Sequence, residues 1–428
     1  MRISPYEIHI NDPEFIDQIQ PGSTVQTYKY AWAQRFFGIR SAGFTTESHD
    51  LHRIRRAAIS PYFSKTSLLR LEPGIQSILD TLIYWLEGLK GSGKPVNFYH
   101  VFASLTADVI GQYAFAQTFG FLDHPDFSPH WQQSIMDISS NGHLLKQFGW
   151  IQPLTEAMPL WLVKIVSPKV MLLLELRENM LKHILRIKAS IARGEQPEGQ
   201  TTIFYDVLSN PQVRPQEKTD DYLQDEAQTL IGAGTATTAA ILTIVTYHLL
   251  SKPHIVQKLQ AELKSLVTRI DGPPKWQQLE QLPYLTAIIT EACRIGYGIP
   301  HRSARKFPDL ELRYGDYRIP KMTPVSMSTV ILHDNPTLFP APRTFVPERF
   351  LEQPHLKKYL NHFARGTRQC VGLNLAYAEL YMTLAAVFWP GRFELELFET
   401  DQSDVETVHD FFNTSPRLDS KGMRVLIN

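Results

Sequence analysis

Cysteine is scarce in this chain of 428 residues, where it occurs only as Cys293 and Cys370. Two cysteines are too few for the disulfide framework of a small secreted domain or for a zinc site of paired Cys-x-x-Cys motifs. We therefore predict a reducing, intracellular compartment. A charge excess is also missing, since 43 basic residues balance 43 acidic ones. Nucleic-acid-binding proteins normally carry a basic excess or a basic face, so we predict no nucleic-acid partner.

The chain also lacks an apolar leader, because residues 1–5 run directly into polar sequence, which predicts no secretory signal peptide. One internal stretch, residues 229–250, carries no Asp, Glu, Lys or Arg and is long enough to cross a bilayer. A helix that is buried all round in a large soluble core has the same composition. We favour the buried helix over the membrane span.

Apolar residues recur every three or four positions over most of residues 49–289, which predicts a largely helical region. A last helix is predicted over about 373–388, and the polar run 194–199 is typical of a surface loop. Alternating patterns predict short strands at 2–10, 310–319, 324–331, 393–397 and 424–427. We expect a mainly α fold with a small β region (α+β). It should form a single domain over residues 1–428, with strand-rich parts near 1–20, 305–332 and 391–428.

The run Phe-Ala-Arg-Gly-Thr-Arg-Gln-Cys-Val-Gly at 363–372 is followed at once by a helical pattern. A cysteine at a helix N-terminus faces unpaired N–H groups and the positive end of the helix dipole, and both favour the thiolate that binds metals. Gly366 and Gly372 allow tight turns or close approach to a flat cofactor. A buried cysteine between two turns is the alternative for this run taken alone.

This run resembles the haem-binding loop of the cytochrome P-450 superfamily, Phe-x-x-Gly-x-Arg-x-Cys-x-Gly, at every fixed position. The resemblance implies the P-450 fold and haem b as cofactor, with Cys370 as the axial thiolate ligand of the iron. It further implies that Arg368 pairs with a haem propionate and that Phe363 shields the sulfur. Eukaryotic members begin with a membrane anchor and first elements that we expect to be absent from this chain.

Glu291 and Arg294 lie three residues apart on a predicted helix, a spacing that is common for surface ion pairs. Downstream, the proline-rich run 345–350 contains Arg349. In the family that the chain resembles, these three residues form a structural charged triad behind the haem loop. Cys293, between the two helix charges, is then a bystander.

Residues 233–238 read Ala-Gly-Thr-Ala-Thr-Thr inside the long uncharged run. Small residues permit close helix packing, which is the plain explanation. The resemblance implies that Gly234 leaves room for dioxygen and that Thr237 donates a hydrogen bond to the bound oxygen and organises waters for proton delivery. The family usually has an acidic residue where this chain has Ala236. Water chains or another acid must then serve, or turnover is slower, or the chemistry needs no such relay.

The basic run at 52–56 is first of all typical of a solvated surface. By resemblance, His52 and Arg56 contact the haem propionates from one helical turn, and Arg302 is a further propionate-binding arginine. Arginine suits the paired geometry of carboxylates.

The apolar segment 148–163 is interrupted by prolines, and core packing is its default interpretation. By resemblance it lies between lid helices over the substrate channel, where Trp150 and Trp161 could anchor in a membrane surface. The family also implies the endoplasmic reticulum membrane as location. Tyr297, Ile299 and Phe412 are expected in the pocket wall.

The chain is similar to fungal P-450 members of specialised metabolism, of the trichodiene-oxygenase type. The resemblance implies insertion of one oxygen atom from dioxygen into an apolar terpenoid or polyketide intermediate, with electrons from an NADPH-dependent flavoprotein reductase. One alternative is a haem-thiolate isomerase or dehydratase, for which Ala236 is the motive. Another is an inactive, truncated haem-binding fragment.

Overall fold

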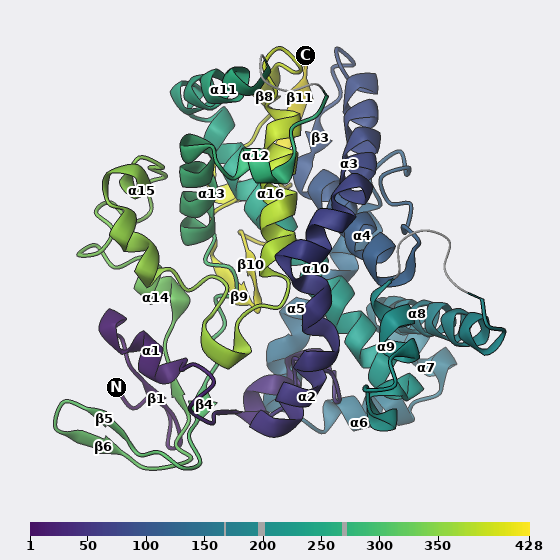
Figure 1. The fold of residues 1–428 in the computed structure, drawn as a ribbon, viewed down its shortest axis with the longest axis vertical. Coiled ribbons are helices and arrows are strands. Elements are labelled where there is room, and N and C mark those ends of the chain that lie inside the picture. Colours follow the sequence, from purple (N-terminus) through teal and green to yellow (C-terminus); the bar gives the residue numbers. More distant parts are fainter. Residues whose placement is uncertain (167, 196–201, 268–271) are drawn as a thin grey trace.

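The computed structural model describes residues 1–166, 168–195, 202–267 and 272–428, and helices dominate it (Figure 1). The α-helices are α1 (Ile16–Ile19), α2 (His49–Ile59), α3 (Lys65–Gly88), α4 (Phe98–Phe115), α5 (Pro129–Gln147), α6 (Ile151–Ala157), α7 (Leu160–Val166), α8 (Pro168–Ala192), α9 (Ile203–Ser209), α10 (Asp220–Leu250), α11 (Pro253–Val267), α12 (Trp276–Leu279), α13 (Pro283–Ile295), α14 (Thr329–His333), α15 (Arg349–Glu352) and α16 (Leu373–Val387). Two 3-10 helices, η2 (Ala31–Phe37) and η6 (Gly366–Arg368), belong to the site described below. The mainly α fold with a small β region is confirmed.

The strands are short and form small sheets. They are β1 (Ile8–His9), β2 (Tyr28–Lys29), β3 (Val96–Asn97), β4 (Arg305–Lys306), β5 (Leu312–Tyr314), β6 (Tyr317–Ile319), β7 (Val325–Ser326), β8 (Leu395–Leu397), β9 (His409–Phe411), β10 (Asn413–Ser415) and β11 (Arg424–Ile427). The sheet orders are β1-β7-β4-β2, β3-β11-β8, β5-β6 and β9-β10. The β2–β4 pair is antiparallel and places Lys29 directly opposite Arg305.

Several predicted elements are observed, and one prediction is wrong in part. The strand predicted at 424–427 is β11, and the helix predicted over 373–388 is α16, with Phe388 as its C-cap. The strand predicted over 324–331 ends at Ser326, because Ser328 caps a helix there by accepting a hydrogen bond from the backbone N–H of Ile331. The predicted loop at 194–199 lies mostly outside the described residues.

The long uncharged run lies in α10, which packs against α4, α8 and α16. Length and composition alone would let α10 cross a membrane, but 67% of its most apolar window is buried inside the protein. Leu223, Ile231, Leu242 and Val245 are fully buried in the main hydrophobic core. We therefore interpret α10 as the central core helix, as the sequence predicts.

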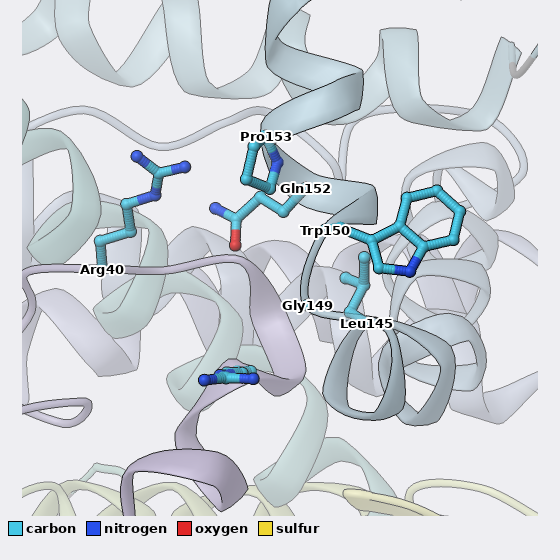
Figure 2. A pocket seen from close by; sticks show the side chains of 7 residues that line it. Arg40, Leu145, Gly149, Trp150, Gln152 and Pro153 are labelled. Atoms are coloured by element: carbon cyan, nitrogen blue, oxygen red, sulfur yellow. The ribbon is translucent and has the colours of Figure 1, made fainter.

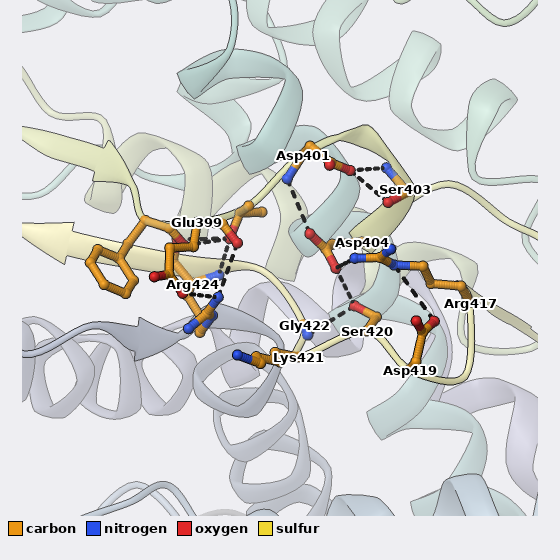
Figure 3. Close-up of polar contacts among 12 residues, drawn as sticks. Glu399, Asp401, Ser403, Asp404, Arg417, Asp419, Ser420, Lys421, Gly422 and Arg424 are labelled. Atoms are coloured by element: carbon orange, nitrogen blue, oxygen red, sulfur yellow. Dashed lines mark hydrogen bonds and ion pairs between the residues drawn. The ribbon is translucent and has the colours of Figure 1, made fainter.

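The segment between β8 and β11 is held in place by a set of polar contacts (Figure 3). Asp404 is buried and accepts hydrogen bonds from Ser420 at 2.6 Å, from Arg417 at 3.4 Å and from the backbone N–H of Asp401 at 3.1 Å. These contacts fix the loop that carries β9, β10 and Phe412 toward the central cavity.

Candidate active site

A cavity of about 360 Å³ lies at the centre of the protein, where α2, α10, the loop before β4 and the start of α16 meet. The predicted catalytic and cofactor-binding residues all line this one cavity: His52, Arg56, Gly234, Thr237, Arg302, Phe363, Arg368 and Cys370. Residues from distant parts of the sequence thus face the same space.

Cys370 stands in the loop directly before α16 and faces the cavity. Its backbone N–H donates to the carbonyl of Phe363 at 2.9 Å, which closes the loop. Burial raises the pKa of the Cys370 thiol. The hydrogen bond from the N–H of Gly372 and the positive charge of Arg56 each act to lower this pKa. The sulfur therefore has thiolate-stabilising neighbours, as expected for a metal ligand at a helix N-terminus.

The backbone of this loop requires glycine at one position. Gly366 has a φ of +65°, and a Cβ there would lie 2.0 Å from the carbonyl oxygen of Pro21. Gly372, by contrast, has no atom within 4 Å of a Cβ position. The ring of Phe363 lies between the rings of His362 and Tyr377, with centroid distances of 4.5 Å and 5.2 Å. These two contacts fix the orientation of the Phe363 ring in the cysteine loop.

A cluster of buried cations lines one side of the cavity. Lys29 and Arg305, cross-strand neighbours on β2 and β4, are 5% and 3% exposed. Like charges placed directly opposite each other destabilise a sheet. Burial and the nearby cations lower the pKa of Lys29, and burial lowers that of Arg305 to about 10. Their hydrogen bonds go to oxygens of Phe44 and Ser303.

Arg368 belongs to the same cluster, and His52 lines the cavity with it. Arg368 donates to the backbone carbonyls of Thr46, Glu47 and Ser48, while its Nε is buried without a hydrogen-bond partner in the described residues. Burial, then the charge of Arg305, lowers the pKa of Arg368 to about 9. Burial, then Arg368, lowers that of His52 to about 2.

This cluster fits a group with two carboxylates. Within the part of the chain that the structure describes, no carboxylate forms an ion pair with Lys29, Arg305 or Arg368. Buried cations are costly unless they are paired. The two propionates of a haem would supply that charge in a cavity that Cys370 also lines, so the residues present fit the cofactor.

Another wall of the cavity is formed by the middle of α10. The hydroxyl of Thr237 lines the cavity and donates to the carbonyl of Ala233 at 2.8 Å, which leaves its oxygen free to accept from a water or ligand. A Cβ at Gly234 would lie 3.1 Å from Ile110 of α4, so the glycine also allows these helices to approach closely. Ala236 is 2% exposed and packs away from the cavity.

The predicted charged triad is present and buried. Both carboxylate oxygens of Glu291 accept from Arg294 at 2.8 Å, and Oε1 also accepts from Arg349 at 3.1 Å and from the backbone N–H of Val346 at 2.9 Å. Glu291 and Arg294 are both 0% exposed. The triad connects α13 to the first residue of α15, and Val346 ties in the segment before it.

Two of the three predicted wall residues line the cavity, namely Ile299 and Phe412. The prediction for Tyr297 is wrong. Its backbone has a φ of +58°, and the side chain turns into the protein, where its hydroxyl donates to Asp334 at 2.7 Å. Sequence reasoning also missed Lys29, Arg305 and Glu379, all of which line the cavity.

Exposed apolar side chains gather on the end of α5, on α6 and on α7. Trp150 and Trp161 are 63% and 66% exposed, which contradicts core packing for these two residues. A surface hollow of about 400 Å³ borders Trp150 and is lined by two arginines, Arg35 and Arg40 (Figure 2). Gln152 closes one side of it by donating to the carbonyl of Gly38 at 2.7 Å.

The sequence profile of the family described as Cytochrome P450 matches residues 8–420. A tryptophan 6-hydroxylase of Fusarium equiseti is 39% identical, over 100% of this chain and 84% of the relative. An N-acetyltryptophan 6-hydroxylase of Emericella nidulans is 37% identical, over 99% of this chain and 84% of the relative. A fusicoccadiene C-8 hydroxylase of Phomopsis amygdali is 34% identical, over 100% of this chain and 83% of the relative.

Proposed function

Because this chain belongs to the cytochrome P450 family and is a haem-dependent monooxygenase, we propose that it inserts one oxygen atom from dioxygen into an apolar small molecule of secondary metabolism. One observation carries the proposal. The sulfur of Cys370 and the hydroxyl of Thr237 face a single cavity, whose side is lined by buried cations that require anionic partners.

The cofactor of the family is haem b, held by a cysteine thiolate. We assign Cys370 as the iron ligand, and Arg368, Arg302, His52 and Arg56 as the groups that hold the propionates. When bound, the haem supplies the activation of dioxygen. In this assignment the protein holds the sulfur, neutralises the propionates and presents the Thr237 oxygen to water in the cavity.

The ferrous-CO difference spectrum of the purified protein tests this assignment. We expect the red-shifted band of a thiolate-ligated haem, which Cys370→Ala should abolish and Cys293→Ala should leave in place. Retention of the band in Cys370→Ala would overturn the ligand assignment. Failure of the wild-type protein to bind haem would support an inactive fragment instead.

Dependence on reductant tests the reaction itself. Product formation should require dioxygen and NADPH with a flavoprotein reductase, which we propose as the electron donor. Product formed without them would favour the isomerase or dehydratase alternative.

For the substrate, the cavity offers mostly apolar walls, including Phe63, Ile110, Leu176 and Ile241. These walls support a terpenoid or polyketide intermediate, and one relative is by name a hydroxylase of fusicoccadiene. A second candidate is a tryptophan derivative, as in the names of two other relatives. The buried Oε1 of Gln34, which has no partner among the described residues, favours it because this acceptor at the cavity could receive an N–H donor. Untargeted metabolite comparison of a deletion strain with its parent would decide between the two.

We also propose that the Trp150 and Trp161 surface rests on a membrane, with the endoplasmic reticulum as location. Membrane association is typical of the family in eukaryotes. Aromatic side chains with a polar edge favour the membrane interface, and the neighbouring Arg35 and Arg40 suit the phosphates of its headgroups.

A further inference from the structure

Aromatic rings from distant parts of the chain gather at one side of the central cavity. Phe36 of η2, Phe44, His301 before β4 and Phe412 between β9 and β10 all line it, and we call these residues the aromatic wall. The ring centroid of Phe36 lies 5.3 Å from that of His301 and 5.5 Å from that of Phe412. The centroid of Phe44 lies 5.6 Å from that of Phe412. Favourable aromatic pairs have such distances, so a flat aromatic ligand could extend this set of contacts.

The ring of His301 is held at both of its nitrogens. The ammonium group of Lys146, on α5, lies 3.2 Å from Nε2 of His301 and has only N–H donors, so Nε2 is the acceptor. The ring proton is therefore on Nδ1, which donates to Oδ2 of Asp410 at 3.2 Å. Because both nitrogens are engaged, His301 offers the cavity an aromatic surface rather than a hydrogen-bonding group.

Asp410 also holds a second member of the aromatic wall. Its Oδ1 accepts a hydrogen bond from the backbone N–H of Phe412 at 2.9 Å, and Phe412 has a left-handed φ of +68°. Such a backbone is uncommon for a residue other than glycine, and it persists where surrounding contacts fix it, often at functional sites. The carbonyl oxygen of Asp410 in turn accepts from Nε2 of His143, on α5, at 2.5 Å. One aspartate thus fixes the positions of both Phe412 and His301.

A hydrogen-bond acceptor without a partner lines the same cavity. Oε1 of Gln34, two residues before Phe36 on η2, is buried and has no partner among the described residues. Gln228 of α10 also lines the cavity, but its Oε1 already accepts from Arg177. A buried acceptor left unsatisfied costs free energy. The Gln34 oxygen therefore favours a ligand that brings a donor group to it.

We infer that the aromatic wall and Gln34 select a substrate with a flat aromatic ring that carries an N–H group, such as an indole, and that Asp410 is the positioning residue of this wall. The substrate ring packs against Phe412 and His301, and its N–H donates to Oε1 of Gln34. A terpenoid, with neither a flat aromatic ring nor an N–H group, would use neither feature. The inference rests on the proposed function and names the substrate class of that site.

Isothermal titration calorimetry of the haem-loaded protein tests the inference without using activity. The probes are indole, benzofuran, which has the shape of indole but an oxygen in place of the N–H group, and limonene, a terpene without an aromatic ring. We expect indole to bind more tightly than limonene and about tenfold more tightly than benzofuran, because its N–H satisfies a buried acceptor. Gln34→Met should remove the preference for indole over benzofuran. Gln228→Met is the matched control and should keep it, since the Gln228 oxygen already has a donor.

The aromatic wall is tested by comparing indole with limonene. Phe412→Leu should weaken indole binding by about two- to tenfold, the contribution of one aromatic pair, and change limonene binding by less than about twofold. Asp410→Ala should have the same effect, because it releases both Phe412 and His301. The matched control is Asp126→Ala, since Asp126 likewise binds a histidine ring and the backbone N–H two residues later but lies outside the cavity lining.

Limonene binding as tight as indole binding in the wild type would refute the substrate class, and an unchanged preference in Gln34→Met would refute the role of Gln34. Equal losses for indole and limonene in Asp410→Ala would show a structural rather than a positioning role. The ferrous-CO spectrum is recorded for every variant. A wild type without the thiolate band would count against the proposed function, whereas the band without a preference for indole would count against this inference alone. If Asp410→Ala does not load haem, Phe412→Leu and Gln34→Met still decide the question.

Discussion

Replacing Glu291 by glutamine should cost the protein a large part of its stability. The carboxylate is 0% exposed and accepts from Arg294, Arg349 and the N–H of Val346 over distances of 2.8–3.1 Å. The neutral amide of the Glu291→Gln variant would keep the shape but leave two buried guanidinium groups without a counter-charge. Removing one member of a buried ion pair typically costs about 3–5 kcal/mol, which is a large fraction of a total stability of about 5–15 kcal/mol.

Urea unfolding followed by far-UV circular dichroism, together with the haem content per protein, would measure the effect. The matched control is Glu178→Gln, which breaks the pair between Glu178 and Lys182 on α8, 65% and 54% exposed. An exposed helical pair of this kind contributes only about 0.3–0.5 kcal/mol. A loss below about 1 kcal/mol in Glu291→Gln, comparable with that of an exposed pair, would show that the triad does not stabilise the fold as its geometry indicates.

Three further predictions follow from single positions. Gly366→Ala should prevent haem loading, because the new Cβ would lie 2.0 Å from the carbonyl oxygen of Pro21. Gly232→Ala, whose Cβ would have no atom within 4 Å, should load haem normally. Equal haem absorbance per protein in the two variants would contradict this prediction. His248 is neutral in the fold, since burial, and then Lys252, lowers its pKa to about 3. In the unfolded state the His248 side chain takes up a proton below about pH 6.5, whereas in the folded state it does not. This protonation of the unfolded state should lower the free energy of unfolding by about 2 kcal/mol between pH 7.5 and 5. His248→Asn should lack this loss in urea titrations at both pH values, and an unchanged pH dependence would refute it. Finally, Trp150→Ala with Trp161→Ala should weaken flotation with liposomes, and unchanged flotation would argue against the proposed membrane surface.

The cysteine loop could be predicted from sequence because its residues are close neighbours in the chain. The backbone turn at Gly366, the hydrogen bond between Cys370 and Phe363 and the start of α16 all lie within about ten positions of one another. Local geometry of this kind leaves a fixed pattern of residue types. The triad could also be predicted, since two of its three members are an i, i+3 pair on one helix.

Other parts of the site depend on tertiary pairing that no local pattern records. Lys29 is brought opposite Arg305 only by the register of β2 and β4. Tyr297 sits in a run that predicts a cavity wall, but the left-handed backbone at this residue turns its side chain toward Asp334 instead. One residue with φ near +58° is enough to reverse the direction of a side chain, and sequence periodicity does not register it.

The cation cluster shows why the missed residues matter for the chemistry. Arg368 alone, with three backbone carbonyls as acceptors, could be a structural arginine that ties the cysteine loop to the start of α2. With Lys29 and Arg305 buried beside it, the same arginine belongs to a group of like charges that would destabilise the fold unless an anion joined them. Two carboxylates that enter with the cofactor relieve this repulsion, so haem binding and folding stability should be coupled in this protein.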